Sequence, residues 1–387
     1  MLVSRLHIIL ILTLILLCGS CVEPYEPVLE ESQEVLVISG MVTDQPGIHL
    51  LTVSLSSSYK LPVFQGLDFC LVAVENQDGD MVHYTNTGEG TYEADLPGSF
   101  LEVGNAVSVQ VITPDDRVYR SLYDTIFACP ELDSIYWELG YQETPDPDFT
   151  RPGIQFYLDM SGESTDSRNI IWQVDESWEY WASLIGTHIM RDWGAAVPFK
   201  TNVIFKCWKH FPLDHVFIAS TRSQSANELR KLPLNFVSNE TERLSVTYSL
   251  NVKQQSLSSA AYDYWKRMND QAVESGGLYE KQPASVTGNI YNMDDPEEIV
   301  LGNFYATQQK EKRIFVKNNV LFDFYVPHID CEFESTSTLW RNRDKIKLPI
   351  YIYNPGNFQP TFWGPEDCFD CRLQGGDTIR PIYWETW

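Results

Sequence analysis

Short stretches of apolar residues, alternating with polar ones and separated by turn-forming residues, fill the chain from residue 34 to residue 128. They cover residues 35–42, 50–55, 71–74, 81–84, 92–96 and 106–112. Asp78-Gly79 and residues 113–116 mark turns between them. No helical period interrupts the series. Residues 34–128 are therefore predicted to form a small antiparallel β-sandwich of immunoglobulin-like type.

The pattern continues past a junction at residues 130–134, but the composition changes there. All 11 tryptophans lie at Trp137 or later. Further strand-like runs occupy residues 154–158, 170–174, 216–219, 244–252, 286–291, 299–305 and 313–316. Residues 129–387 are predicted to form a second, larger domain that is also mainly β.

One segment of this second domain has a helical period instead. Ser258 or Ser259 can cap its start, and Gly276-Gly277 can end it. Its apolar stripe consists of Ala261, Tyr262, Trp265, Met268 and Ala272. Aromatic residues at this spacing usually pack against a sheet, so the stripe is predicted to belong to the core.

The first residues have the pattern of a signal for export. Residues 8–17 are apolar apart from Thr13, which is too short for a span of about 20 residues but suits a signal peptide. The segment from Leu17 to Cys21 resembles a bacterial lipobox, although Cys18 stands where Leu is usual. We predict a signal peptide over residues 1–20 and lipid attachment at Cys21. The alternative is an ordinary secretory signal.

Residues 21–33 are rich in proline and glutamate, a composition that does not pack into a core, and they are predicted to be an acidic tether. The whole chain carries a formal net charge of -25. A phosphate backbone would be repelled by this charge, so nucleic acid is excluded as a partner. Solubility at a crowded surface explains the acidity better than a specific cation site.

Six cysteines remain once Cys18 and Cys21 are set aside, and an even number in an exported chain predicts disulfides. Six cysteines allow 15 connectivities, and the sequence does not choose among them. The spacing of the last pair also fits a zinc or thioredoxin-like site, with Cys207 and His210 as a second half-site for a metal, but an oxidising envelope favours disulfides. The six candidates are Cys70, Cys129, Cys207, Cys331, Cys368 and Cys371.

Signatures of catalysis are not found. There is no nucleophile elbow, HExxH motif, P-loop or dinucleotide fingerprint, and the histidines are scattered. We therefore expect no enzyme activity, cofactor or metal. Trp178, Glu179, Tyr180 and Trp181 form one aromatic cluster, in which Trp178 and Tyr180 would share a strand face and could bind sugars or apolar peptides. Burial in the core is the competing and better-supported interpretation.

Several ordered motifs resemble one known family. They include Ile38-Ser39-Gly40, residues 246–254, Tyr262-Asp263-Tyr264-Trp265, Gly288-Asn289-Ile290, Val300-Leu301-Gly302-Asn303-Phe304, residues 368–376, Pro381 and Tyr383-Trp384. Together with the lipobox, this set resembles the Bacteroidota lipoproteins grouped as domain of unknown function 4249, over nearly the whole mature chain. Tyr383 stands where the pattern has Phe. Cys70 and Cys129 are additions to it, and we predict that they pair with each other.

The resemblance implies an outer-membrane lipoprotein that is associated with a TonB-dependent receptor and helps to capture or pass on a ligand. It supplies no catalytic residues. The leading hypothesis is therefore a non-enzymatic accessory to a transport receptor, held to the outer membrane by lipid on Cys21. The alternatives are an independent surface adhesin or structural envelope protein and, third, a hydrolase.

Overall fold

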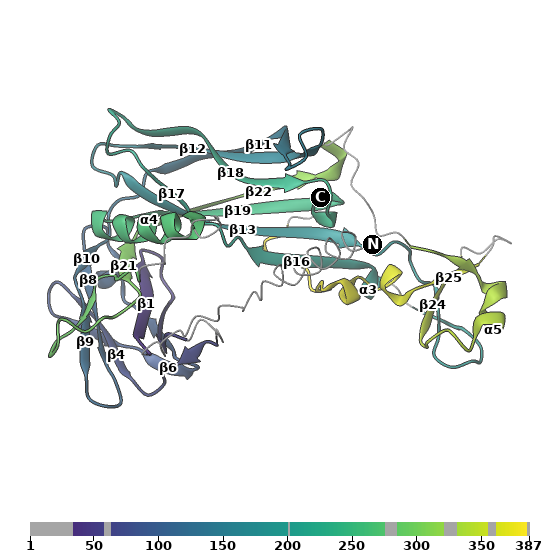
Figure 1. Ribbon diagram of the computed structural model, residues 1–387, viewed down its shortest axis with the longest axis horizontal. Helices are drawn as coiled ribbons and strands as arrows, with labels where there is room; N and C mark the ends of the chain where they lie inside the picture. Colours follow the sequence, from purple (N-terminus) through teal and green to yellow (C-terminus); the bar gives the residue numbers. More distant parts are fainter. Residues whose placement is uncertain are drawn as a thin grey trace, which may run out of the picture.

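The computed structural model describes residues 34–57, 63–199, 202–274, 285–320, 331–354 and 361–384. The predicted signal peptide, the tether, the lipid site at Cys21 and the Gly276-Gly277 helix stop lie outside these residues. The chain is mainly β, as predicted, and its strands form five sheets. Figure 1 shows a sandwich, a central pair of sheets and a smaller third unit.

The sandwich consists of two sheets whose inner faces share one apolar core. The first has the order β21-β1-β2-β7-β6, with β3 paired to β2, and contains β1 (Leu36–Thr43), β2 (Ile48–Leu55), β3 (Gln65–Gly66), β6 (Thr85–Gly88), β7 (Thr91–Asp95) and β21 (Phe304–Thr307). The second has the order β20-β9-β8-β4-β5, with β10 paired to β8, and contains β4 (Leu71–Asn76), β5 (Met81–His83), β8 (Ala106–Ile112), β9 (Val118–Ser121), β10 (Asp124–Thr125) and β20 (Ile290–Asn292).

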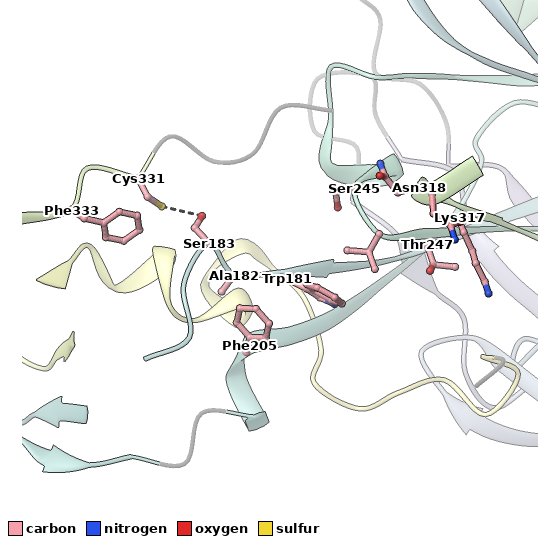
Figure 2. A pocket seen from close by; sticks show the side chains of 12 residues that line it. Trp181, Ala182, Ser183, Phe205, Ser245, Thr247, Lys317, Asn318, Cys331 and Phe333 are labelled. Carbon is pink, nitrogen blue, oxygen red and sulfur yellow. Dashed lines mark hydrogen bonds between the residues drawn. The ribbon is translucent and has the colours of Figure 1, made fainter. Parts of the chain in front are cut away.

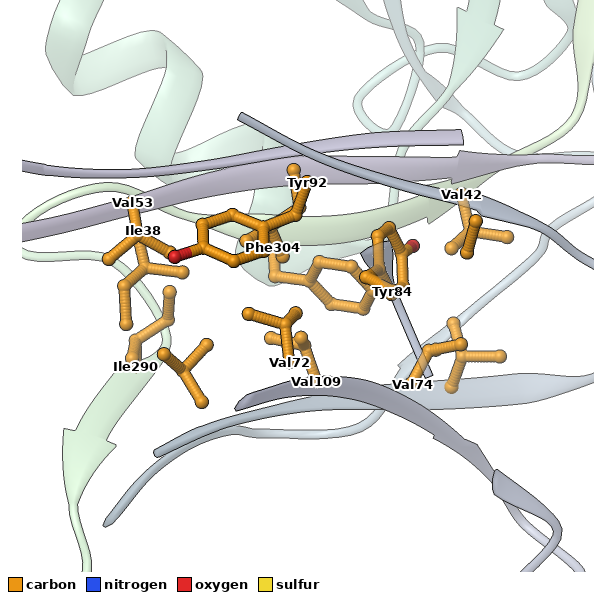
Figure 3. Packing of buried hydrophobic residues seen from close by; sticks show 14 of the residues in the cluster. Ile38, Val42, Val53, Val72, Val74, Tyr84, Tyr92, Val109, Ile290 and Phe304 are labelled. Carbon is orange, nitrogen blue, oxygen red and sulfur yellow. The ribbon is translucent and has the colours of Figure 1, made fainter. Parts of the chain in front are cut away.

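This sandwich is not confined to residues 34–128, which corrects the predicted boundary. Strand β21 pairs in parallel with β1, and β20 pairs with β9, so residues from the later part of the chain complete both sheets. Phe304 is fully buried in the sandwich core, in a cluster that includes Ile38, Val72 and Val109 (Figure 3). The predicted strands at 286–291 and 299–305 exist in shorter form, but they belong to the first unit.

The central unit packs two sheets against each other around a second apolar core. One sheet has the order β11-β12-β18 and contains β11 (Glu131–Glu143), β12 (Thr150–Gly162) and β18 (Asn227–Ser238). The other has the order β16-β13-β19-β22, with β17 paired to β13, and contains β13 (Asn169–Trp181), β16 (Lys206–Pro212), β17 (Phe217–Ser220), β19 (Thr247–Ser256) and β22 (Gln309–Lys317).

The third unit is built around a small sheet with the order β15-β14-β24-β25-β23. Its strands are β14 (His188–Met190), β15 (Val197–Pro198), β23 (Glu334–Ser335), β24 (Ile350–Tyr353) and β25 (Phe362–Gly364). They come from an excursion after β13 and from the last part of the chain, and two small apolar clusters form their core. Sequence patterning did not predict this unit.

Helix α4 (Ser259–Glu274) is the prominent helix that the sequence predicts. The Ser258 hydroxyl accepts a hydrogen bond from the Ala261 amide at 3.1 Å, which identifies Ser258 as the N-cap. Ala261, Tyr262 and Trp265 of the predicted stripe pack between the sandwich and the central unit (Figure 1). Met268 and Ala272, also predicted as core, are exposed because the later turns of the helix extend beyond this cluster. The other helices are single turns: α2 (Gly98–Leu101), α3 (Asn202–Phe205), α5 (Leu339–Asn342), η1 (Glu242–Leu244), η2 (Asn318–Val320), η3 (Thr336–Thr338), η4 (Glu366–Cys368) and η5 (Cys371–Gln374).

Candidate binding pocket

The predicted aromatic cluster lies at the end of strand β13, where successive side chains point to opposite faces of the sheet. Trp178 and Tyr180 point into the core of the central unit, with exposed fractions of 6% and 1%. Trp181 takes the other face and is 44% exposed. The alternation is as predicted, but the exposed ring is Trp181.

Tyr180 has a structural role that its burial makes clear. Its hydroxyl donates a 2.5 Å hydrogen bond to the carbonyl of Cys371, and burial raises the pKa of this phenol. A Cβ atom on Gly376 would lie 2.1 Å from the same hydroxyl, so only glycine fits there. Trp178 packs in a stack with Phe211. Trp178 and Tyr180 therefore belong to the core, as the core interpretation of the aromatic cluster predicts.

A cavity of about 820 Å³ opens beside Trp181, at one end of the second central sheet. Adjacent strands of this sheet are antiparallel, so the end of β13 meets the start of β16 and of β19 and the end of β22. Cys331 and Phe333 of the third unit line the far side (Figure 2). We call this cavity the aromatic pocket; it is lined by Trp181, Ala182, Ser183, Phe205, Ser245, Val246, Thr247, Lys317, Asn318, Asn319, Cys331 and Phe333.

Neighbouring groups fix the orientation of the Trp181 ring. Lys206, its partner in the register of β13 and β16, places its ammonium 4.6 Å from the ring centroid. The indole N–H donates to the Glu179 carboxylate at 2.6 Å, and the Phe205 ring lies 5.7 Å away. A cation over an indole is worth about 0.5–1 kcal/mol at an exposed site. The ring is therefore held in place at the pocket wall before any ligand arrives.

The charge of the pocket differs from that of the whole chain. Acidic residues outnumber basic ones by 53 to 28 in the sequence, yet the residues that line the pocket include Lys317 and no Asp or Glu. The hydroxyl oxygen of Ser245 is buried there and has no hydrogen-bond partner among the described residues. Aromatic rings beside a few hydroxyl and amide groups suit a neutral ligand with both apolar and polar faces.

Two disulfides hold the third unit in place. Cys207 of β16 is bonded to Cys371, and Cys331 is bonded to Cys368. The predicted disulfides among these four cysteines are confirmed. The two cysteines of the CxxC motif do not bond to each other but to different partners, which leaves no thiols there for zinc or redox exchange.

The predicted bond between Cys70 and Cys129 is wrong, because both are buried free thiols in different units. Cys70 lies in the sandwich core, whereas the Cys129 sulfur contacts the carbonyl of Gln254 in the central unit at 3.7 Å. Burial raises the pKa of the Cys129 thiol to about 12, so this cysteine stays protonated and unreactive.

Ser177 and His210, which sequence spacing did not bring together, meet on the face of the β13–β16 pair that also carries Trp181. Ser177 Oγ lies 2.9 Å from His210 Nδ1 and 2.9 Å from the Tyr383 hydroxyl. A serine–histidine pair can form a nucleophile, but Ser177 is completely buried, so a substrate carbonyl has no path to its oxygen. Ser177 and His210 are in contact because they are paired in the register of β13 and β16, and no sequence motif predicts this pairing.

Other types of site are not found among the described residues. No group of three or more His, Cys, Asp or Glu side chains is placed to hold a metal ion in that part of the chain. Within the same residues, no helix is both long and apolar enough to cross a membrane.

Comparisons with known proteins give one family. The family model described as "Domain of unknown function (DUF4249)" matches residues 22–313. No curated protein matches the sequence. Among solved structures, trypsin-activated alpha-2-macroglobulin from Escherichia coli is similar at 10% identity and a TM-score of 0.19. That match covers 59% of this chain and 15% of the macroglobulin.

Proposed function

We propose that this chain, which belongs to the family described as domain of unknown function DUF4249, is a non-enzymatic lipoprotein that captures a ligand for a transport receptor. Lipid on Cys21 would anchor it to the outer membrane, and the acidic tether of residues 21–33 would hold the folded part away from the lipid. The lipobox-like segment that ends at Cys21 supports the anchor. Its motifs resemble those of the Bacteroidota lipoproteins of this family, and this resemblance supports a TonB-dependent receptor as the partner.

The observation that carries ligand capture is the aromatic pocket. Its volume of about 820 Å³ lies within the range of about 300–1,000 Å³ that is usual for ligand sites. Three rings, those of Trp181, Phe205 and Phe333, face this space from two different units. Since Trp181 is already held by Lys206 and Glu179, stacking on it would order little that was free before.

The lining also limits the ligand. Flat rings bind the apolar face of a sugar or the side chains of an apolar peptide, while Ser245, Thr247 and Asn318 offer hydrogen bonds. A strongly cationic ligand would find no carboxylate among the lining residues. We therefore propose a neutral ligand with an apolar face, of the size of a short oligosaccharide or peptide.

Arrays of neutral glycans and apolar peptides, probed with the mature protein, test ligand capture. Trp181→Ala should lower binding to the recognised class at least tenfold, because it removes the ring at the pocket wall. Tyr141→Ala is the matched control, since Tyr141 is an exposed aromatic residue on strand β11 that does not line the pocket. Equal binding by the wild type and Trp181→Ala would contradict the proposed role of the pocket.

A further inference from the structure

We propose a second binding site, in a groove between helix α4 and the outer face of the first sandwich sheet, for a neutral amide carbonyl beside an aliphatic side chain. The groove has a volume of about 230 Å³ and shares no residue with the aromatic pocket. Figure 1 shows α4 beside β1 and β21. These two strands contribute Ser39, Gly40, Met41 and Tyr305 to the lining of the groove. The lining residues are Ser39, Gly40, Met41, Leu50, Tyr264, Trp265, Asn303 and Tyr305.

Two residues that line this groove each carry a buried hydrogen-bond donor that has no acceptor among the described residues. Asn303 is only 6% exposed, and its Nδ2 is buried without a partner. The indole Nε1 of Trp265 is also buried without a partner. Buried polar groups in folded proteins are nearly always hydrogen-bonded, so two unpaired donors lining one groove point to an acceptor that comes from outside the chain.

The Trp265 ring and the backbone of Asn303 are held by neighbouring groups. The Trp265 ring makes edge contacts with Tyr264 at 5.6 Å and with Tyr305 at 6.1 Å between centroids. The main-chain carbonyl of Asn303 accepts a hydrogen bond from the main-chain amide of Gly40 at 3.2 Å. The nearby Asn289 has hydrogen-bond partners for both polar atoms of its side chain. Its Nδ2 donates to the Phe304 carbonyl at 2.7 Å, and its Oδ1 accepts from the Phe304 amide at 3.0 Å. The backbone of this region thus satisfies one asparagine and leaves the other unpaired.

The chemistry of the groove selects a neutral carbonyl. Its donors are uncharged, no charged residue lines it, and the net charge of -25 disfavours a carboxylate. Its volume falls below the range of about 300–1,000 Å³ for a drug-sized ligand, which suits one side chain with its peptide group. Met41 and Leu50 supply apolar contact. Binding requires a lining side chain to move before a carbonyl oxygen reaches the buried donors, and Leu50, at 52% exposed, is the least enclosed of the apolar ones.

Residues of three sequence motifs meet at the groove. Ser39-Gly40, Tyr264-Trp265 and Asn303 belong to motifs that are widely separated along the chain, and none of them lines the aromatic pocket. Packing accounts for the glycine of the third motif, because Gly302 has a φ of +90° and a Cβ there would lie 2.0 Å from the Ile38 carbonyl. Packing does not account for the two unpaired donors.

The indole N–H signal of Trp265 in a ¹⁵N spectrum of the mature protein tests this site, with Trp265→Phe identifying the signal. Titration with N-acetyl-leucine methylamide should shift it in a saturable way. The indole of Trp172 already donates to Gln254 at 2.9 Å and should not move. N-acetyl-leucine, which carries a carboxylate, should bind at least tenfold more weakly. A leucine-containing pentapeptide distinguishes the sources: tighter binding than the single residue indicates a peptide chain, and equal binding a small molecule.

Asn303→Leu keeps the volume and the Trp265 reporter while removing one donor, and it should weaken binding of the methylamide at least tenfold. Its thermal transition, compared with that of the wild type, shows that the variant is folded. A Trp265 signal that does not shift with either neutral probe would overturn the proposal. So would equal affinities of the folded Asn303→Leu variant and the wild type.

Discussion

Trp178 and Trp181 show how much one step along a strand changes the role of a residue. The alternation of β13 could be predicted from the sequence, and so could the separation of the two indoles onto opposite faces. Which face would be covered could not be predicted, because that depends on β11, β12 and β18 packing from elsewhere in the chain. Composition therefore indicated the right cluster for the candidate site but the wrong ring.

This difference predicts losses of stability of different size for two similar substitutions. Trp178→Ala should lower the free energy of unfolding by about 3–5 kcal/mol, as expected for a buried aromatic side chain. Trp181→Ala should lower it by about 1 kcal/mol or less, because it loses one cation–π contact at a half-exposed position. Denaturant unfolding of both variants under oxidising conditions measures the two values. Equal losses would contradict the assignment of one ring to the core and the other to the pocket.

Asp124 predicts a pH dependence of stability. Burial raises the pKa of its carboxyl, which accepts a hydrogen bond from the Ala306 amide of β21 at 2.9 Å. The unfolded chain then gives up this proton at a lower pH than the folded one. Protonated Asp124 therefore contributes to the stability of the fold below about pH 3.9, the ordinary pKa of an aspartate in the unfolded chain. This contribution is lost as the pH rises through the higher pKa of the folded state.

Asp124→Asn keeps an oxygen acceptor for the Ala306 amide but does not titrate. Its free energy of unfolding should fall less than that of the wild type between pH 4 and pH 7. Unfolding curves of both proteins at several pH values test this. If the free energies of unfolding of both proteins change equally with pH, the pKa of Asp124 is not raised in the folded state and the prediction is contradicted.

Strands are predicted well from the sequence where one face is buried and the other is exposed to solvent. The predicted runs in residues 35–112 each coincide with a strand of the sandwich. Strand β11 was missed because most of its positions are exposed or half-buried and show no alternation. Strand β18 was missed because two register shifts and a positive φ of 54° at Lys231 break its period.

The disulfides predict how the third unit depends on covalent bonds. Two small apolar clusters supply its core, so the bonds Cys331–Cys368 and Cys207–Cys371 carry much of its stability. Replacing either pair with serine should cost about 2–5 kcal/mol, more for Cys207–Cys371, whose sequence separation is 164 against 37. Loss of Cys331–Cys368 alone should expose the third unit to proteolysis and leave the sandwich resistant.

Peptide mapping under non-reducing conditions checks the pairing directly. It should find these two bonds, with Cys70 and Cys129 alkylated only after denaturation. Four free thiols among the other cysteines, or a bond between Cys368 and Cys371, would contradict the structure.

At the scale of the whole molecule, the sequence separated two domains that the fold interlocks. Strands β20 and β21 join the sandwich from residues 290–307, β20 antiparallel to β9 and β21 parallel to β1, and no local sequence pattern predicts these pairings. A chain that starts at residue 129 should therefore fail to fold like the intact protein, because Phe304 and Ala306 would lose the partners that bury them. Dye binding to exposed apolar surface and the loss of a cooperative thermal transition measure this. A cooperative transition in that fragment would contradict the interlocked fold.

We propose that lipid on Cys21 holds this protein beside a transport receptor, and gentle solubilisation of membranes that carry the tagged, full-length protein tests this proposal. We expect mass spectrometry of the purified material to identify a TonB-dependent barrel in near-stoichiometric amount. Cys21→Ala, which cannot receive lipid, should leave the membrane fraction and lose the barrel. Purification of the wild-type protein alone, or with structural envelope proteins only, would contradict the account and favour an independent adhesin or structural role.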